Sequence, residues 1–176
     1  MWRKTSLYWG KRSSGKPLTY LGNKMAGDGS GKTQQARNRQ LICARQWKTY
    51  KDTGLFSDMW TLDAGAARTD SKSCDEFAFA NALQSAGNST SPNPVTYSGK
   101  ECVQTYLRRN PGDTMTLHLR PDAPAPTWKE PCGRSSMSNW QNTQSMQPFG
   151  DFIKEQRLME NDNYWLDLDG FTAPAP

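Results

Sequence analysis

The four cysteines of the chain constrain its fold more than any other feature of the sequence. Cys43, Cys74, Cys102 and Cys132 are well separated and form no Cys-x-x-Cys pair, so the spacing of a zinc ribbon is absent. The only histidine is His118, which argues against a Cys/His zinc site as well. An even set of spaced cysteines instead predicts two disulfides in an oxidising compartment, and the sequence leaves all three possible pairings open.

The length of 176 residues predicts one domain with a sizeable core. Only 35% of the residues are hydrophobic, but seven Trp, six Tyr and six Phe supply large side chains for that core. No apolar run is long enough to span a membrane, so we expect no membrane partner. The pattern of elements favours an α+β fold, a single compact domain with a small antiparallel sheet and a few short helices.

Local patterns place these short elements along the chain. The Ser-, Asn- and Gln-rich stretch 133–147 predicts loops and turns, which would also supply hydrogen bonds to phosphate or metal-bound water. Within 114–119, apolar and polar residues alternate, and His118 falls on the polar face. We expect helices over 33–50, 75–86 and 151–158, and strands over 18–21, 55–62, 95–107, 114–119 and 164–168.

Positive charge is concentrated at the N-terminal end of the chain. Residues 1–40 carry nine Lys or Arg and one acid, Asp28, whereas the rest of the chain carries thirteen basic and sixteen acidic side chains. Because this segment is also rich in Gly and Ser, we interpret it as a basic flexible arm or linker. Such an arm would bind phosphate backbones electrostatically. A non-catalytic nucleic-acid-binding module that uses the arm is therefore the alternative function.

Two adjacent carboxylates, Asp75 and Glu76, precede an apolar pattern formed by Phe77, Ala80 and Leu83. The pattern predicts that both acids stand at the start of a helix, where free backbone N–H groups favour negative charge. Capping of that helix alone would explain them. The dipeptide by itself favours capping, and a site that holds a divalent metal or moves a proton is the alternative.

Asp63 and Arg68 lie shortly before this pair of carboxylates. Carboxylate oxygens suit Mg²⁺, Mn²⁺ or Ca²⁺, and a bound metal both activates water and shields the charge of a phosphate. An arginine can grip developing negative charge through two parallel hydrogen bonds. Surface acids paired with a neighbouring arginine would give the same spacing.

Other patterns for hydrolysis find less support in the sequence. Residues 26–33 fit a permissive phosphate-binding loop, but no buried strand leads directly into it. No Gly-x-Ser-x-Gly sequence is present, and a catalytic triad would have to use His118. Nothing near His118 in the sequence would orient its ring, so a surface or structural role explains it better. Carboxylate chemistry therefore remains.

The sequence Lys-Ser-Cys-Asp-Glu-Phe-Ala-Phe-Ala at residues 72–80 resembles the Asp-Glu-aromatic-Pro-x-Ala signature of the sporulation-type extracellular deoxyribonucleases, the NucA/NucB family. Ala78 stands where that family usually has proline. The resemblance extends over about residues 55–171. Its further anchors are a short Asp-containing strand at 61–68, a Ser-x-Asn segment within 135–142, and the stretch from Phe149 that leads to the last strand.

The resemblance implies a metal-dependent, non-specific endonuclease that hydrolyses phosphodiester bonds in DNA, with the nuclease domain over 41–176. Asp63 and Glu76 would hold Mg²⁺ or Mn²⁺ or activate water. Asp75 would support them from beside the expected helix start. These roles follow from the family resemblance together with the chemistry of the carboxylates.

Three further residues are expected to act on the phosphate. Gln84 and Asn139 would orient phosphate or metal-bound water, because an amide can donate and accept hydrogen bonds but cannot act as a base. Arg68 would stabilise the negative charge that develops around phosphorus.

The cysteines and the resemblance together imply a secreted protein. Residues 1–5 lack the apolar stretch of a secretory signal, so we expect either part of a longer exported chain or an internal protein with reduced cysteines. A C-terminal toxin domain of a larger secreted protein is one such setting, and a dedicated immunity protein would then be a partner. DNA is the expected substrate, and we expect a monomer.

Overall fold

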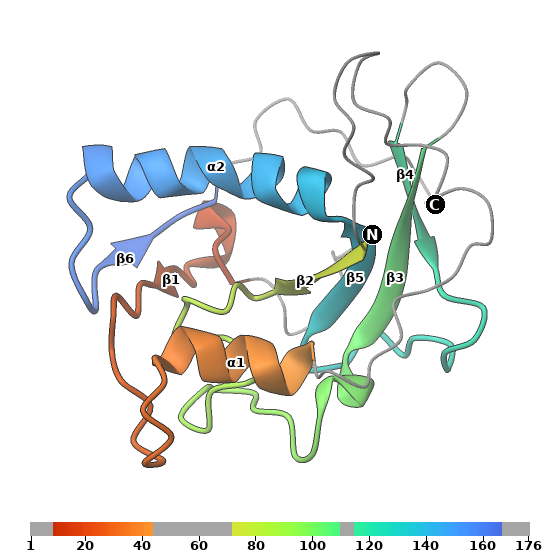
Figure 1. Ribbon diagram of the computed structural model, residues 1–176, viewed down its shortest axis with the longest axis horizontal. Coiled ribbons are helices and arrows are strands. Elements are labelled where there is room, and N and C mark those ends of the chain that lie inside the picture. The colour runs from red at the N-terminus through yellow and green to blue at the C-terminus, as the bar shows by residue number, and fades with distance from the viewer. Residues whose placement is uncertain (1–8, 44–71, 110–114, 167–176) are drawn as a thin grey trace.

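A computed structural model describes residues 9–43, 72–109 and 115–166, which form the α+β fold expected from the sequence (Figure 1). The helices in these ranges are α1 (Gln34–Ile42) and α2 (Asn139–Glu155), with short 3-10 helices at Arg12–Ser14 and Gly99–Glu101. Neither α-helix combines the length and apolar character that a membrane crossing requires. The strands are β1 (Leu18–Thr19), β2 (Lys72–Phe77), β3 (Val103–Arg109), β4 (Met115–Leu119), β5 (Gly133–Ser138) and β6 (Asn163–Tyr164).

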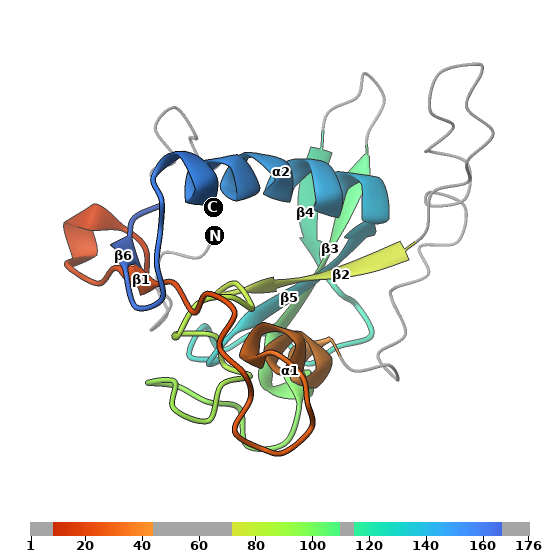
Figure 2. The same cartoon turned by 60° about the vertical axis from the view of Figure 1, so that its left-hand side comes forward.

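The strands form two separate sheets. β1 and β6 pair antiparallel, with Leu18 opposite Tyr164. The larger sheet has the order β2-β5-β3-β4, and its β2–β5 and β3–β4 pairs are antiparallel. The central β3–β5 pair is parallel, so the sheet is mixed where the sequence predicted an antiparallel one. α1 and α2 lie on opposite sides of β2, as two views agree (Figures 1 and 2).

The helix expected over 33–50 starts where the sequence predicts and is shorter in the described residues. The side-chain oxygen of Thr33 accepts a hydrogen bond from the Ala36 amide, which satisfies one of the free N–H groups of the first turn. The helix ends at Ile42, and Cys43 follows as its C-cap.

α1 docks through a buried amide and two glycines. Asn38 is fully buried, and its Nδ2 donates a hydrogen bond to the Ala80 carbonyl oxygen at 2.7 Å. A Cβ atom on Gly87 would lie 2.6 Å from the Asn38 Cα, and one on Gly99 would overlap the Ile42 carbonyl oxygen. Only glycine permits so close an approach of backbone to helix.

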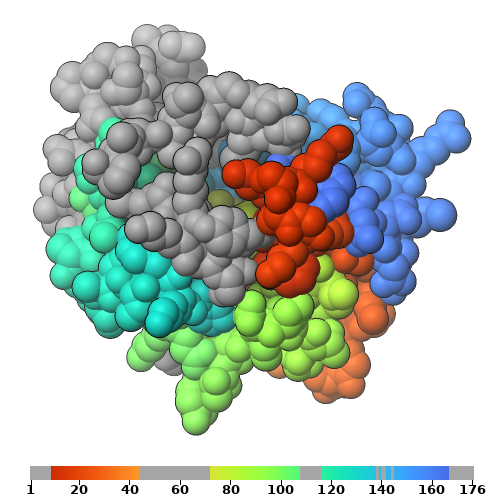
Figure 3. Space-filling view, turned by 180° about the vertical axis from the view of Figure 1, so that it is seen from behind, coloured from red at the N-terminus to blue at the C-terminus, as the bar shows by residue number. Residues whose placement is uncertain are grey.

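The segment that the sequence suggests as a flexible arm is anchored in the fold at several points, although many of its side chains are exposed. Leu18 and Leu21 are almost fully buried. In the space-filling view, the red residues of this segment lie against blue residues near the C-terminal end of the described chain (Figure 3). Residues 9–40 are therefore part of the folded domain, which differs from the expectation of an arm over 1–40. A few buried leucines anchor the segment despite the polar composition around them.

The stretch 133–147 forms regular structure, so the expectation of loops there is wrong. β5 occupies its first half and is hydrogen-bonded to a strand on each side. α2 begins directly after it and continues to Glu155, so the expected helix over 151–158 is the end of a longer one. The backbone pairing of β5 within the sheet outweighs the weak strand preference of serine. No local sequence pattern reveals such pairing.

The remaining strand predictions have mixed outcomes. The strand expected over 114–119 is confirmed as β4. The one expected over 95–107 begins only at Val103, because a turn and a 3-10 helix precede it. The last strand is the two-residue β6, and the strand expected over 55–62 lies outside the described residues.

Two apolar clusters hold these elements together. One contains Ile42, Ala86, Val95, Cys102 and Cys132, so it lies under α1. The other surrounds the small sheet, where Leu18, Ala78, Ala82 and Tyr164 are buried and where the aromatic rings of α2 pack. The larger sheet and the two helices thereby bring the C-terminal residues of α1, β2 and the start of α2 close together.

Candidate active site

The carboxylates of Asp75 and Glu76 lie in a strand, which corrects the helix expected over 75–86. They belong to β2, which pairs with β5 along its whole length, and turns follow Phe77. Because that pairing engages the backbone of β2, no helix starts at these acids. They are therefore not helix caps.

The two acids point to opposite faces of the sheet, since successive side chains alternate along a strand. Glu76 is buried and stands opposite Arg134 of β5, whereas Asp75 is half-buried and stands opposite Ser135. Their carboxylates do not converge on one point. Contacts with α1 show that Glu76 is the acid on the α1 side.

Glu76 contacts Arg39 of α1. The Arg39 Nε lies 3.3 Å from the Glu76 Oε1, and the Glu76 side chain is only 3% exposed whereas that of Arg39 is 53% exposed. Burial raises the pKa of Glu76 to about 7, even though Arg39 acts to lower it, and the neighbouring Asp75 adds to the rise. Burial also raises the pKa of Asp75 to about 6. Glu76 can therefore both take up and release a proton near neutral pH.

The Cys43–Cys74 disulfide fixes this contact. Cys43 caps α1 and Cys74 lies in β2, so the bond ties the helix to the strand two residues from Glu76. The Cys43 Sγ lies 3.5 Å from the Glu76 Oε2. The second disulfide joins Cys102 to Cys132. Together the two bonds correspond to one of the three pairings that the sequence left open.

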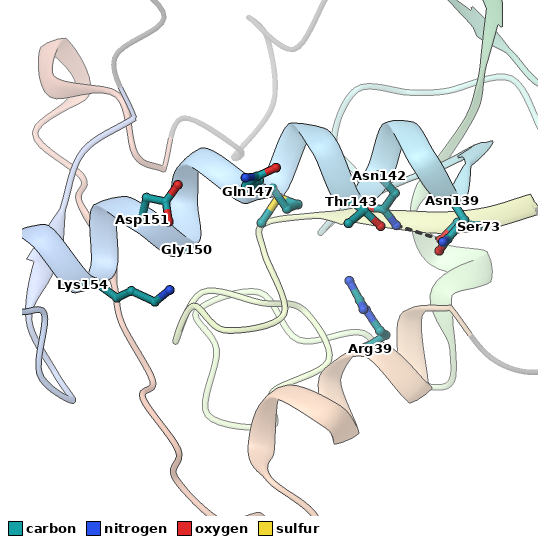
Figure 4. A pocket seen from close by; sticks show the side chains of 10 residues that line it. Arg39, Ser73, Asn139, Asn142, Thr143, Gln147, Gly150, Asp151 and Lys154 are labelled. Atoms are coloured by element: carbon teal, nitrogen blue, oxygen red, sulfur yellow. Dashed lines mark hydrogen bonds between the residues drawn. The ribbon is translucent and has the colours of Figure 1, made fainter. Parts of the chain in front are cut away.

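A groove of about 530 Å³ opens between α1 and α2 beside this contact (Figure 4). Arg39 lines it from α1, Ser73 from β2, and Asn139 from the first position of α2. The buried Asn142 closes the groove against β2, because its Nδ2 donates hydrogen bonds to the Ser73 Oγ at 2.8 Å and to the Cys74 carbonyl oxygen at 3.2 Å. Arg39 thus belongs to both the groove and the Glu76 contact.

The structure brings only some of the expected site residues together. Asn139 lines the groove and Glu76 contacts Arg39, which also lines it, whereas Asp63 and Arg68 lie outside the described residues. Gln84 holds β1: its Oε1 accepts a hydrogen bond from the Thr19 amide at 2.9 Å, and its Nε2 donates to the Thr19 Oγ1. Both amide atoms of Gln84 are therefore engaged within the protein.

Arg39 is the site residue that the sequence did not reveal. It stands four residues before Cys43, and residues at this spacing share a helix face. Cys74 and Glu76 share a strand face in the same way. Knowledge of the Cys43–Cys74 pairing would thus have placed Arg39 near Glu76, but the sequence leaves the pairing open.

The only metal-binding group found among the described residues contains Cys43, Cys74 and Glu76, whose ligand atoms lie within 4.8 Å of one another. The two sulfur atoms are bonded to each other, so Glu76 is the one available ligand. A single buried carboxylate suits Mg²⁺ or Mn²⁺, which proteins bind through one or two carboxylates together with substrate phosphates and water. Glu76 would therefore supply one carboxylate ligand to such an ion, which would need further ligands from elsewhere.

The other patterns considered in the sequence have structural explanations. The His118 ring stacks on Tyr106, and its Nε2 lies 2.6 Å from the Thr116 Oγ1. In the glycine-rich turn over 26–33, Lys32 donates a hydrogen bond from its Nζ to Gln40, and Thr33 serves as the cap of α1.

Comparison with known proteins gives no relative for this fold and site. The sequence matches no protein-family profile, and neither a curated protein nor a solved structure shows significant similarity to it. The functional conclusion therefore depends on the chemistry of the site and on the motif around Glu76.

Proposed function

We propose that the protein is a divalent-metal-dependent endonuclease that hydrolyses phosphodiester bonds in DNA. One observation carries this proposal: the buried Glu76 carboxyl, whose pKa is about 7, contacts an arginine that opens onto a polar groove. A proton-transferring acid next to a cation is what hydrolysis of an anionic ester needs. The resemblance of residues 72–80 to the NucA/NucB signature adds the substrate class.

Arg39 is suited to bind the phosphate. Its Nε is directed to Glu76, and among the described residues its two terminal nitrogens have no hydrogen-bond partner. Figure 4 shows the guanidinium group directed into the space between the two helices. Arg39 can therefore donate hydrogen bonds to phosphate oxygens while it keeps Glu76 in place.

Glu76 would either transfer the proton of the attacking water or, once ionised, hold the Mg²⁺ or Mn²⁺ ion, for which Asp63 remains the other expected ligand. The ion supplies positive charge that neutralises the phosphate and lowers the pKa of water. Asn139, at the mouth of the groove, would orient the phosphate through its side-chain amide. The Cys43–Cys74 bond and Asn142 would keep α1, β2 and α2 in register around these groups. Asp75, on the other face of β2, would act on the charge of Glu76 and not on the phosphate.

A plasmid-nicking assay tests the proposal. We expect cutting in Mg²⁺ or Mn²⁺, its abolition by EDTA, and a loss of at least about 100-fold in the Glu76→Gln variant, the usual contribution of a general acid or base. Glu160→Gln is the matched control, because Glu160 is exposed and lies outside the groove. Cutting that survives EDTA or Glu76→Gln would contradict the proposed site. Binding of DNA without any cutting would favour the non-catalytic alternative.

The two disulfides fit an oxidising, extracellular-type environment. We propose further that the domain acts outside the cell that makes it, as part of a longer exported chain, and that it does so as a monomer. If it is a toxin domain, its producer needs a protein that blocks the site. A neighbouring gene whose product binds this protein and stops plasmid nicking would support that setting.

A further inference from the structure

The groove between α1 and α2 continues along α2 away from Glu76. Its lining residues on this helix recur at intervals of three or four, so they form one stripe that runs from Asn139 to Lys154. At a rise of 1.5 Å per residue, this stripe is about 22 Å long. The groove is therefore much longer than a single phosphate needs.

Hydrogen-bonding side chains cover most of the stripe. Asn139, Thr143 and Gln147 are exposed and line the groove at successive turns of the helix. Gly150 follows in the interior of the helix, where a Cβ atom would meet nothing within 4 Å. Packing against the described residues therefore does not require this glycine, and its lack of a side chain leaves room in the groove.

Two cations reach into the groove from different helices. Arg39 does so from α1, and Lys154 does so from the last turn of α2 (Figure 4). Lys154 is exposed and forms no ion pair within the ranges that the structure describes. Asp151 is the one acid among the described lining residues, so the titratable side chains that the structure places in the groove carry a net positive charge.

Among the residues that the structure describes, no aromatic side chain lines this groove. Proteins that stack unpaired nucleic-acid bases rely on aromatic rings, whereas contacts to the backbone use cations and neutral hydrogen-bond donors. The lining therefore suits a phosphodiester backbone, whose recognition does not depend on base sequence.

We infer that the stripe on α2 is a binding track for the phosphodiester backbone of a nucleic acid, with Arg39 at its catalytic end and Lys154 at its far end. The inference rests on the proposed function for the class of ligand. It adds that the nucleic-acid strand runs from the site along α2 and passes over Gly150. Lys154 binds the substrate without a part in the reaction itself.

Binding measured without cleavage tests this track. Fluorescence anisotropy in EDTA would follow labelled DNA 12-mers, single-stranded in one arm and double-stranded in the other, with two sequences in each. Lys154→Gln should weaken binding about two- to fivefold at low salt, the effect of one accessible charge contact. The slope of log affinity against log salt concentration should fall by about 0.7 to 0.9. Both sequences should respond alike.

Two variants make the test specific. Lys129→Gln removes the same charge from an exposed residue outside the groove and should leave the affinity nearly unchanged. Asp151→Asn removes the acid that lines the described part of the groove and should strengthen binding. The arm in which Lys154→Gln has its effect shows whether the track takes a single strand, a duplex or both.

The outcomes separate this inference from the proposed function. Plasmid nicking with unchanged 12-mer affinity in Lys154→Gln and Asp151→Asn would overturn the track and leave the nuclease standing. Groove-dependent binding without nicking would support the track and contradict the nuclease. Equal losses in Lys154→Gln and Lys129→Gln would also overturn it, because they would show a general charge effect.

Discussion

The two disulfides close loops of almost the same size in very different surroundings. Cys43 and Cys74 are separated by 31 residues and Cys102 and Cys132 by 30, so each bond limits the unfolded chain to the same extent. Cys102–Cys132 is buried in an apolar cluster, whereas Cys43–Cys74 is half-buried beside the Glu76 carboxyl. We conclude that one bond stabilises the core and the other positions the site.

Removal of the disulfides should give the largest effects. Cys102→Ala with Cys132→Ala should lower the free energy of unfolding by about 4 kcal/mol from loop entropy, with a further loss from the cavity in the core. Nicking activity per folded molecule should change little. Denaturant unfolding together with the nicking assay would measure both.

Cys43→Ala with Cys74→Ala is the matched comparison. The entropic loss should again be about 4 kcal/mol, because the loop is equally long. The nicking activity of the molecules that remain folded should fall at least tenfold, since α1 no longer holds Arg39 against Glu76. Equal activities of the two double variants would show that the Cys43–Cys74 bond has no positioning role.

The pH dependence of stability should come from Glu76, beside the Cys43–Cys74 bond, and be of order 3 kcal/mol. The folded state raises the pKa of Glu76 from 4.5 to about 7, so it binds the proton more tightly than the unfolded chain does. This contribution is complete below pH 4.5 and is lost as the pH rises through about 7. In EDTA, the free energy of unfolding should therefore fall from pH 5 to pH 8.

Glu76→Gln provides the control for that measurement. The variant should lose most of the slope, and it should be more stable than the wild type at pH 8, because no buried carboxylate has to ionise. Asp75, whose pKa is also raised, would leave a smaller slope at lower pH. A slope that is unchanged in the variant would contradict the assignment of the effect to Glu76.

Gly87→Ala tests how tightly α1 is docked beside the apolar cluster that contains Cys102 and Cys132. The added methyl group would overlap the backbone of Asn38, so we expect a loss of about 1–3 kcal/mol in thermal or denaturant unfolding. Gly27→Ala is the control, because nothing lies within 4 Å of the added Cβ there. Equal stability of the two variants would mean that α1 can shift away from Gly87 at no cost.

Gly150→Ala should have the smallest effect and the opposite sign. A glycine in the interior of a helix costs roughly 0.5–1 kcal/mol relative to alanine, and the new methyl group would meet none of the residues that the structure describes. The variant should therefore melt at a slightly higher temperature. If the groove takes the DNA backbone, the same variant should also bind the 12-mers less well. A lower melting temperature would show that Gly150 serves the fold.

The sequence predicts those parts of the fold that depend on local chemistry. Thr33 starts a helix because its hydroxyl caps the first turn. Within 114–119, apolar and polar residues alternate, as expected for a strand with one polar face. The arrangement around Glu76 could not be predicted in this way. Its strand forms because a distant serine-rich segment pairs with it, and no local pattern of apolar residues reports such pairing.

The candidate site shows the same limit. The motif at Asp75 and Glu76 marks the right place in the chain, but only the strand geometry shows that the two acids face different ways. Arg39 enters the site from a segment whose composition suggests a flexible arm. Deletion of residues 1–40 would remove the buried Leu18 and Asn38 as well as Arg39, so point variants are the sounder test of the binding-module alternative.

The pairing of β1 with β6 has a consequence for how the protein is made. Thr19 and Asn163, which the pairing joins, are 144 residues apart in the chain. At about 5–20 residues per second, a ribosome needs roughly 7–30 seconds to add the partner strand after the first one has been made. During that interval Leu18 has no strand to pair with. The nascent segment around Leu18 therefore stays unpaired until β6 has been synthesised, and chaperones would have their longest opportunity to bind it there.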